Sequence, residues 1–322
     1  MPPTISIIIA TYQRPHLIGR ALDSVAAQTH LPHEIIVIDD ASGDDTADIV
    51  AAWAARRGVR VEYIEQPENR GVGAARNAAM RQATGQYVGF LDSDDAYLPH
   101  ALETLTGPLI THPHVIVSFA DAMQYWDDSR PSIPMMRRCL DHDHDTAAFD
   151  FDHPAWRRLN DPQSALLTTS MIPTCAALFR RTAAEAVGLM PEYRHGEDWI
   201  FWLKLTGQGD FVGQFTDVAT VHRQGDNQTG AEHDGRNARL TLNALLGLRD
   251  GRFDVCLTGA NRQRLERAIA EKAGHMRYHG SRAGLAAYWD LLSSTEAAAT
   301  GGRIGHLLAD PKSLLRATFS KL

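Results

Sequence analysis

The sequence has few cysteines and no long apolar run, and these absences exclude several classes of protein. It contains three cysteines in 322 residues, widely spaced at Cys139, Cys175 and Cys256. An odd, scattered set is neither a disulfide framework nor a zinc site, so we expect reduced side chains in a cytoplasmic protein. No stretch approaches the roughly 18 apolar residues that a membrane-spanning helix needs, and we find no internal repeat.

The chain also lacks an excess of basic charge. Its formal net charge is −7, which argues against nucleic acid as the main partner because phosphate neutralisation requires a basic face. The first apolar run, residues 5–10, has no basic segment before it, and we interpret it as a strand rather than a signal peptide. The remaining composition is that of a soluble globular protein with one large domain and room for an appendage.

The first hundred residues alternate between strand-like and helix-like segments. Four short runs rich in β-branched residues are typical of buried parallel strands. They are ISIIIA (5–10), EIIVID (34–39), RVEYIE (60–65) and QYVGFL (86–91). Helical patterns lie between them, the first opening near Pro15. Strands joined by helical crossovers predict an α/β fold whose parallel sheet has helices on both faces.

Polar side chains gather where these strands end, and ligands of such sheets bind beyond the carboxyl ends of the strands. A flat heteroaromatic base could stack on Tyr12, and Arg14 or Arg76 could meet phosphates as a planar fork. Clustered carboxylates repel one another, and a divalent cation that bridges a diphosphate would remove that repulsion. The residues at the strand ends are Thr11, Tyr12, Arg14, Asp39, Asp40, Asp92, Asp94 and Asp95.

Each of these motifs has a plainer interpretation when taken alone. The acidic stretch 92–95 is also typical of a solvated turn, and Asp39 and Asp40 of turn carboxylates. GVGAAR (71–76) approximates a dinucleotide-binding fingerprint, but Arg76 replaces the third glycine. Glycines that only let a helix begin close to the sheet explain it equally well.

The order of the motifs is more specific than any one of them. ISIIIATYQRP, IIVIDDASGDDT, NRGVGAARNAA and GQYVGFLDSDDAYLP follow one another in register. This series closely resembles the inverting nucleotide-sugar glycosyltransferases of family 2, which have the GT-A fold. The resemblance covers residues 5 to about 105 and resumes at 171–229. There MIPTCAALFRRTAAEAVGLMPEYRHGEDWIFWLKL is similar to the family's acceptor-side segment, which ends in a Glu-Asp motif.

The resemblance implies a divalent metal, Mn²⁺ or Mg²⁺, and a role for individual residues. Asp198 is implied to be the general base, with Glu197 orienting a substrate beside it. His222 is the candidate histidine ligand of the metal, although Gln224 occupies the aligned position. The implied metal ligands are Asp94, Asp92 and His222, and the implied donor-binding residues are Thr11, Tyr12, Arg14, Asp39, Asp40, Arg76, Asp92 and Ser93.

The resemblance also implies a domain plan and a reaction. We expect a GT-A type, Rossmann-like, mostly parallel sheet flanked by helices in residues 1–230, then a small helical region in 231–322. Residues 1–105 would bind the nucleotide sugar and 106–230 the acceptor. One sugar would move from a nucleotide-diphosphate sugar, with a UDP-sugar favoured, to a carbohydrate or glycoconjugate hydroxyl. An NAD-dependent oxidoreductase and a non-catalytic sugar-nucleotide-binding protein on the same fold remain as alternatives.

The middle of the chain and its tail give weaker signals. We expect DHDHD (141–145) in a loop over the site, and acceptor contacts from Trp156, Arg157 and Arg158. The tail, residues 303–322, carries four basic residues against one acidic residue. The sequence also leaves a homo-oligomer open.

Two interpretations of the tail remain. Leu314, Leu315 and Phe319 fall near one helical face. The tail is then either a helix lying on the anionic inner face of a membrane or a terminal helix docked on its own domain.

Overall fold

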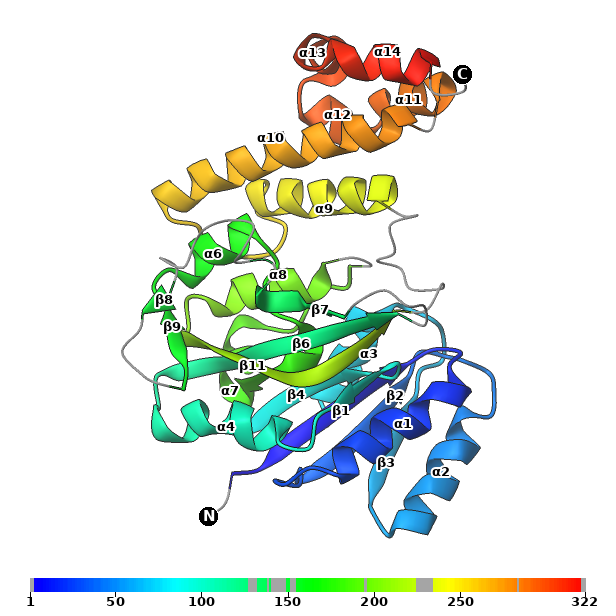
Figure 1. The fold of residues 1–322 in the computed structure, drawn as a ribbon, viewed down its shortest axis with the longest axis vertical. Coiled ribbons are helices and arrows are strands. Elements are labelled where there is room, and N and C mark those ends of the chain that lie inside the picture. Colours follow the sequence, from blue (N-terminus) through cyan, green and yellow to red (C-terminus); the bar gives the residue numbers. More distant parts are fainter. Residues whose placement is uncertain are drawn as a thin grey trace. The chain divides into compact units, whose positions relative to one another are not determined.

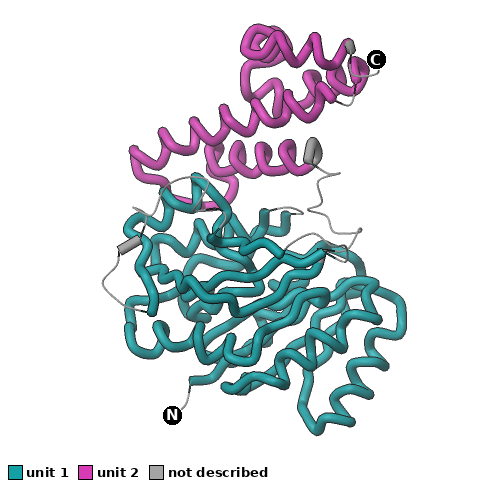
Figure 2. Tube along the Cα trace, viewed as in Figure 1, with its two compact units in different colours: residues 1–224 teal, residues 225–322 magenta. Residues whose placement is uncertain are grey.

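The computed structural model divides the chain into two compact units, residues 1–224 and 225–322 (Figure 2). The Asp-His stretch at 141–145 and Gln224 lie outside the residues that the structure describes. The described residues are 3–126, 132–137, 139, 149–150, 155–193, 196–223, 234–282 and 284–319.

The amino-terminal half of the first unit contains the four predicted strands. They are β1 (Ile5–Thr11), β2 (Glu34–Asp39), β3 (Val61–Glu65) and β4 (Tyr87–Asp92). These strands are parallel and lie in the order β3-β2-β1-β4 (Figure 1). This arrangement confirms the predicted parallel sheet.

Helices α1 (Pro15–Ala26), α2 (Thr46–Arg57) and α3 (Val72–Met80) connect these strands. α1 opens on Pro15, whose fixed φ suits a first helical turn, and α2 ends at Gly58 in the left-handed conformation. Alternate β1 residues join the apolar side chains of α1 and α2 in one core, while α3 packs against β1 and β2. The helices therefore fix where the strand ends lie.

The second half of this unit extends the same sheet. The antiparallel strand β10 (Ala177–Arg180) separates β4 from β6 (Val115–Trp126), and β11 (Asp210–Arg223) then pairs with β6 in parallel. The sheet is therefore mostly parallel, as predicted. The other elements are β5 (Asp95–Tyr97), α4 (Ala101–Thr111), β7 (Ile133–Pro134), β8 (Phe149–Asp150), β9 (Arg157–Leu159), α6 (Pro162–Thr168), η2 (Thr174–Ala176), α7 (Arg181–Val187) and α8 (Glu197–Leu205).

The second unit is helical, as predicted. It consists of α9 (Asp234–Arg249), α10 (Gly259–Arg282), α11 (Leu285–Leu292), α12 (Thr295–Ala299), α13 (Gly302–Ala309) and α14 (Pro311–Phe319). None of the described helices combines the length and the apolar content that crossing a bilayer requires.

The structure separates two of the three apolar residues that were predicted to share one face of the tail. Leu314 packs against a small core of Tyr288, Leu292 and Ala317, whereas Leu315 is 60% exposed. Successive residues of a helix point about 100° apart, which lets Leu314 face that core while Leu315 faces away from it. The side chain of Phe319 lies outside the described residues.

Candidate active site

The predicted polar residues meet at one edge of the sheet, which we call the rim. Thr11 of β1 is opposite Asp39 of β2, and Ala10 is opposite Asp92 of β4. A tight turn after β4 contains the buried Ser93 and leads into β5. Asp92, Asp94 and Asp95 each place a possible ligand atom within 4.8 Å of the other two.

Two arginines offset the repulsion within this carboxylate cluster. Nη1 of Arg14 lies 2.5 Å from Oδ2 of Asp94, and Nη2 of Arg76 lies 2.6 Å from Oδ1 of Asp92. Arg20, which the sequence did not single out, donates to the backbone carbonyl of Asp94. The acidic stretch is therefore more than a solvated turn, because guanidinium groups neutralise it.

Arg76 links the cluster to a second pair of carboxylates. Its Nη1 lies 3.1 Å from Oε1 of Glu197, and its guanidinium carbon lies 5.3 Å from the ring centroid of Phe90. Burial disfavours the charge, but the neighbouring carboxylates outweigh burial and raise the pKa of Arg76. A cation this deeply buried is a fixed structural link between β4 and α8.

Glu197 and Asp198 open α8, directly after Gly196 in the left-handed conformation. Glu197 is buried, and burial together with the charge of Asp198 raises its pKa to about 7, against the opposing effect of Arg76. The partly exposed Asp198 accepts a hydrogen bond from the Thr174 hydroxyl at Oδ2 and from the Trp199 N–H at Oδ1, 2.7 Å away. Asp198 is thus oriented and still reachable from solvent.

The second glycine of GVGAAR, Gly73, allows close packing. A Cβ added to Gly73 would lie 2.9 Å from the carbonyl oxygen of Pro191 and 3.2 Å from Cγ of Glu197. Nearby, the Asn77 amide pairs with the backbone of Met190 through two bonds of 2.9 Å. The plainer interpretation of this motif is supported, since its second glycine lets α3 approach the segment that carries Glu197.

Asp39 and Asp40, predicted to hold a nucleoside, both accept hydrogen bonds from neighbouring segments of the chain. The hydroxyl of Tyr63 donates to Oδ2 of Asp39 over 2.7 Å, and the Ser42 N–H donates to its Oδ1 over 2.8 Å. Asp40 accepts from three donors of the loop before α3: the Gln66 side chain and the Arg70 and Gly71 N–H groups. Asp39 therefore accepts fewer of these hydrogen bonds than Asp40 and has more capacity left to accept one from a ligand. The sequence alone does not distinguish the two neighbouring carboxylates in this way.

The loop after β1 has features that suit a binding surface. The ring of Tyr12 is 42% exposed, and the buried hydroxyl of Thr11 has no hydrogen-bond partner in the described structure. Gln13 has φ of 52° and Ala41 has φ of 64°, a strained region for residues other than glycine. The Gln13 N–H donates to Oγ of Ser42 over 2.8 Å, which holds this strained loop in place.

The predicted histidine ligand is less well placed. His222 lies on β11 one residue beyond Val221, which pairs with Asp95. Its ring stacks on Tyr125, with the ring centroids 6.1 Å apart. Within the described structure it does not belong to the carboxylate cluster. A metal contact from His222 stays a prediction.

The carboxylate cluster suits a divalent cation. Mg²⁺ and Mn²⁺ prefer hard oxygen ligands at about 2.1 Å, so opposite ligands stand roughly 4.2 Å apart. The 4.8 Å spread of the cluster is only slightly wider. The guanidinium of Arg14 already provides positive charge against Asp94. The type and spacing of these three carboxylates therefore fit the implied metal after a small contraction.

A family model identifies the chain. Residues 6–188, more than half of the sequence, match the model described as glycosyl transferase family 2. The chain belongs to this family. This membership argues against the alternative of an NAD-dependent oxidoreductase. The packing role of Gly73 agrees, because it explains the glycine without a dinucleotide.

Curated relatives are similar over part of their length. An uncharacterized glycosyltransferase of Nostoc is 40% identical over 31% of this chain, and one of Rickettsia felis is 37% identical over 70% of it. The succinoglycan biosynthesis protein ExoO of Rhizobium meliloti is 38% identical over 32% of this chain. The matched regions span 31%, 34% and 29% of these three relatives, so the chain covers about a third of their length.

Solved structures establish the GT-A fold of this family 2 chain. TarS of Staphylococcus aureus, in complex with UDP-GlcNAc, gives a TM-score of 0.63 at 19% identity over 90% of this chain and 79% of its own. The mannosyltransferase PcManGT of Pyrobaculum calidifontis, in complex with GDP-Man and Mn²⁺, gives 0.59 at 20% identity over 100% of this chain and 89% of its own. Both are GT-A glycosyltransferases.

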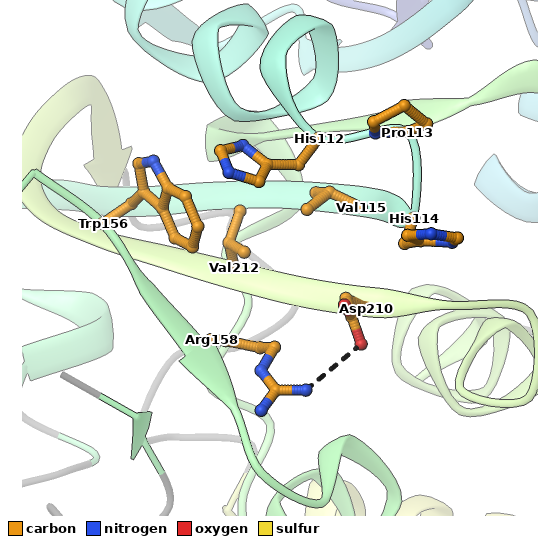
Figure 3. Close-up of a pocket in the computed structure, with 8 residues that line it drawn as sticks. All are labelled: His112, Pro113, His114, Val115, Trp156, Arg158, Asp210 and Val212. Carbon is orange, nitrogen blue, oxygen red and sulfur yellow. Dashed lines mark ion pairs between the residues drawn. The ribbon is translucent and has the colours of Figure 1, made fainter. Parts of the chain in front are cut away.

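A separate cavity of about 300 Å³ lies at the amino-terminal ends of β6 and β11 (Figure 3). Trp156 and Arg158 line it, and Nη1 of Arg158 lies 3.8 Å from Oδ1 of Asp210. Arg157 instead lies over the ring of Phe215. Because the carboxylate cluster follows the carboxyl ends of the strands, this cavity is at the opposite edge of the sheet. The predicted acceptor contacts from Trp156 and Arg158 are therefore not supported.

Proposed function

We propose that this protein is a metal-dependent, inverting glycosyltransferase. It would move one sugar from a nucleotide-diphosphate sugar, with a UDP-sugar favoured, to a hydroxyl of a carbohydrate or glycoconjugate acceptor. The observation that carries the proposal is the carboxylate cluster at the rim, which Arg76 joins to Glu197 beside Asp198. The solved structures with UDP-GlcNAc and with GDP-Man and Mn²⁺ support it.

The donor would lie across the carboxyl ends of β1, β2 and β4. Asp92, Asp94 and Asp95 would hold Mn²⁺ or Mg²⁺, which supplies positive charge where the diphosphate leaves. The exposed ring of Tyr12 offers a stacking surface for the base. The unpartnered Thr11 hydroxyl and the Asp39 carboxylate offer hydrogen bonds to the nucleoside.

The reaction would be one in-line displacement at the anomeric carbon. Asp198 would accept the proton of the acceptor hydroxyl as that oxygen attacks. The bonds from Thr174 and Trp199 hold its carboxylate in one orientation and leave accepting capacity on each oxygen. Glu197 would hold the position of Arg76 at the floor of the site and orient a substrate.

The domain plan follows from this placement. We propose that residues 1–105 bind the nucleotide sugar and that 106–230 bind the acceptor, with Asp198 on the acceptor side. The acceptor would be a growing glycan or glycoconjugate, because ExoO is a succinoglycan biosynthesis protein. A cytoplasmic location would give the protein access to nucleotide sugars.

A thermal-shift screen of UDP-, dTDP- and GDP-sugars, with and without Mn²⁺, tests the proposal. A ligand that binds the native state at a hundred times its Kd adds about 2.7 kcal/mol to the free energy of unfolding. We expect at least one nucleotide sugar to raise Tm by several degrees with Mn²⁺ and clearly less with EDTA. NADH is the control and should have no effect. Stabilisation by a donor that is never cleaved or transferred would favour the non-catalytic alternative.

We also propose that the carboxy-terminal helices contact an anionic membrane surface. On α13, Ile304 and Leu308 are one turn apart and are 75% and 78% exposed, while Leu307 packs inward. Arg303 and Lys312 are exposed on the segment formed by α13 and α14. The net charge of this segment is positive, whereas that of the whole chain is negative. Exposed aliphatic side chains beside basic residues favour binding to anionic lipid.

Vesicle sedimentation tests this membrane contact. The Ile304→Ser/Leu308→Ser variant should bind phosphatidylglycerol-containing vesicles at least about tenfold more weakly than the unmodified chain. Leu31→Ser, which alters a residue 63% exposed in the first unit, is the matched control and should bind normally. If the unmodified chain ignores such vesicles at low salt, the helices are only docked on their own unit.

A further inference from the structure

Arg14 and Arg76 both neutralise the carboxylate cluster, but they are held very differently. The Arg76 side chain is 3% exposed and is fixed between Asp92 and Glu197. The Arg14 side chain is 24% exposed, whereas that of its partner Asp94 is 8% exposed. Of these two arginines, Arg14 is therefore the one that can leave the cluster without opening the core.

The position of Arg14 conflicts with cation binding. Its Nη1 lies 2.5 Å from Oδ2 of Asp94, one of the two oxygens that this carboxylate can offer to a metal. A guanidinium and a divalent cation on one carboxylate repel each other strongly at such short distances. Binding of a cation by Asp94 therefore favours an Arg14 side chain that has turned away.

The backbone limits how far Arg14 can go. The preceding residue, Gln13, is anchored by its N–H to Ser42, and the Arg14 carbonyl accepts from the Leu17 N–H of α1 over 3.1 Å. A displaced guanidinium therefore stays at the rim, where the donor's diphosphate would lie. Guanidinium groups bind phosphate oxygens through paired, charge-assisted hydrogen bonds.

We propose that Arg14 is a cation-responsive switch in the donor site, an inference that rests on the proposed function. Without a cation it neutralises Asp94. When the cation binds, it is displaced and holds the donor's diphosphate. Arg14 thus opposes binding of the metal alone and favours binding of the nucleotide with the metal, so the two ligands bind in concert.

The test is a pair of titrations with opposite expected signs. We expect Arg14→Gln to bind Mn²⁺ alone about tenfold more tightly than the unmodified protein, because its competitor is gone. With saturating Mn²⁺ the same variant should bind UDP about tenfold more weakly, because one phosphate contact is lost. Free Mn²⁺ is read by electron paramagnetic resonance and UDP binding by calorimetry.

Arg57→Gln is the matched control. Arg57 also forms a 2.6 Å ion pair, with Asp23, but both side chains are about half exposed and neither belongs to the rim. It should change neither titration. Unchanged or weaker Mn²⁺ binding by Arg14→Gln would overturn the switch while leaving the proposed function intact. If the unmodified protein binds neither Mn²⁺ nor any nucleotide, the proposed function and the switch both fail.

Discussion

Replacing Asp198 with asparagine should lower turnover by about a hundred- to ten-thousand-fold. A sugar hydroxyl is a poor nucleophile, and an amide of the same shape cannot accept its proton. Thr174 donates to Oδ2 and the Trp199 N–H to Oδ1, and an amide oxygen can still accept one of these bonds. Donor affinity with Mn²⁺ should change little, since Asp198 is proposed to act on the acceptor. Steady-state transfer and calorimetry of the donor separate these two effects.

Glu197→Gln is the comparison that locates the base. Glu197 is buried against Arg76, so the glutamine amide of the variant should disturb the position of that guanidinium. We expect this change to lower turnover less than Asp198→Asn does. Near-normal turnover by Asp198→Asn, with a collapse in Glu197→Gln, would move the base to Glu197. The raised pKa of Glu197, about 7, shows that its charge is already partly disfavoured at neutral pH.

The Asp94→Ala change should weaken Mn²⁺-dependent donor binding by at least about a hundredfold, because it removes one of the three carboxylates proposed to hold the metal. If the clustered carboxylates had no cationic partners, removing one of them would relieve repulsion and stabilise the metal-free protein. Asp94 is instead paired with Arg14, so we expect Tm in EDTA to stay level or fall. Calorimetry with and without EDTA measures the binding.

Asp23→Ala is the control for Asp94→Ala. It removes a carboxylate from an exposed ion pair with Arg57 and should leave donor binding unchanged. Donor affinity in Mn²⁺ that survives Asp94→Ala would mean that the acidic stretch does not hold the metal.

Local sequence patterns were sufficient to predict the rim. Apolar runs identify parallel strands, and parallel strands end at one edge, so Thr11, Asp39 and Asp92 had to lie close together. The pairing partners were not predictable in the same way. Arg76 and Glu197 are 121 positions apart, and their ion pair depends on how α3 and α8 pack.

The misplaced predictions have the same origin. Nothing local in the sequence distinguishes the two ends of β6 and β11, so Trp156 and Arg158 were expected near the acceptor but line a cavity at the other end. Thr174 precedes Asp198 by 24 positions, and only the fold brings its hydroxyl to that carboxylate.

The anomeric configuration of the first product tests the central claim most directly. With an α-linked nucleotide sugar selected by the thermal-shift screen and Mn²⁺, water can serve as a slow acceptor even before the natural acceptor is known. Proton NMR distinguishes the two anomers of the released sugar before they interconvert. A single displacement at the rim predicts that the β anomer appears first and that Asp198→Asn abolishes its formation. Initial release of the α anomer would contradict the account.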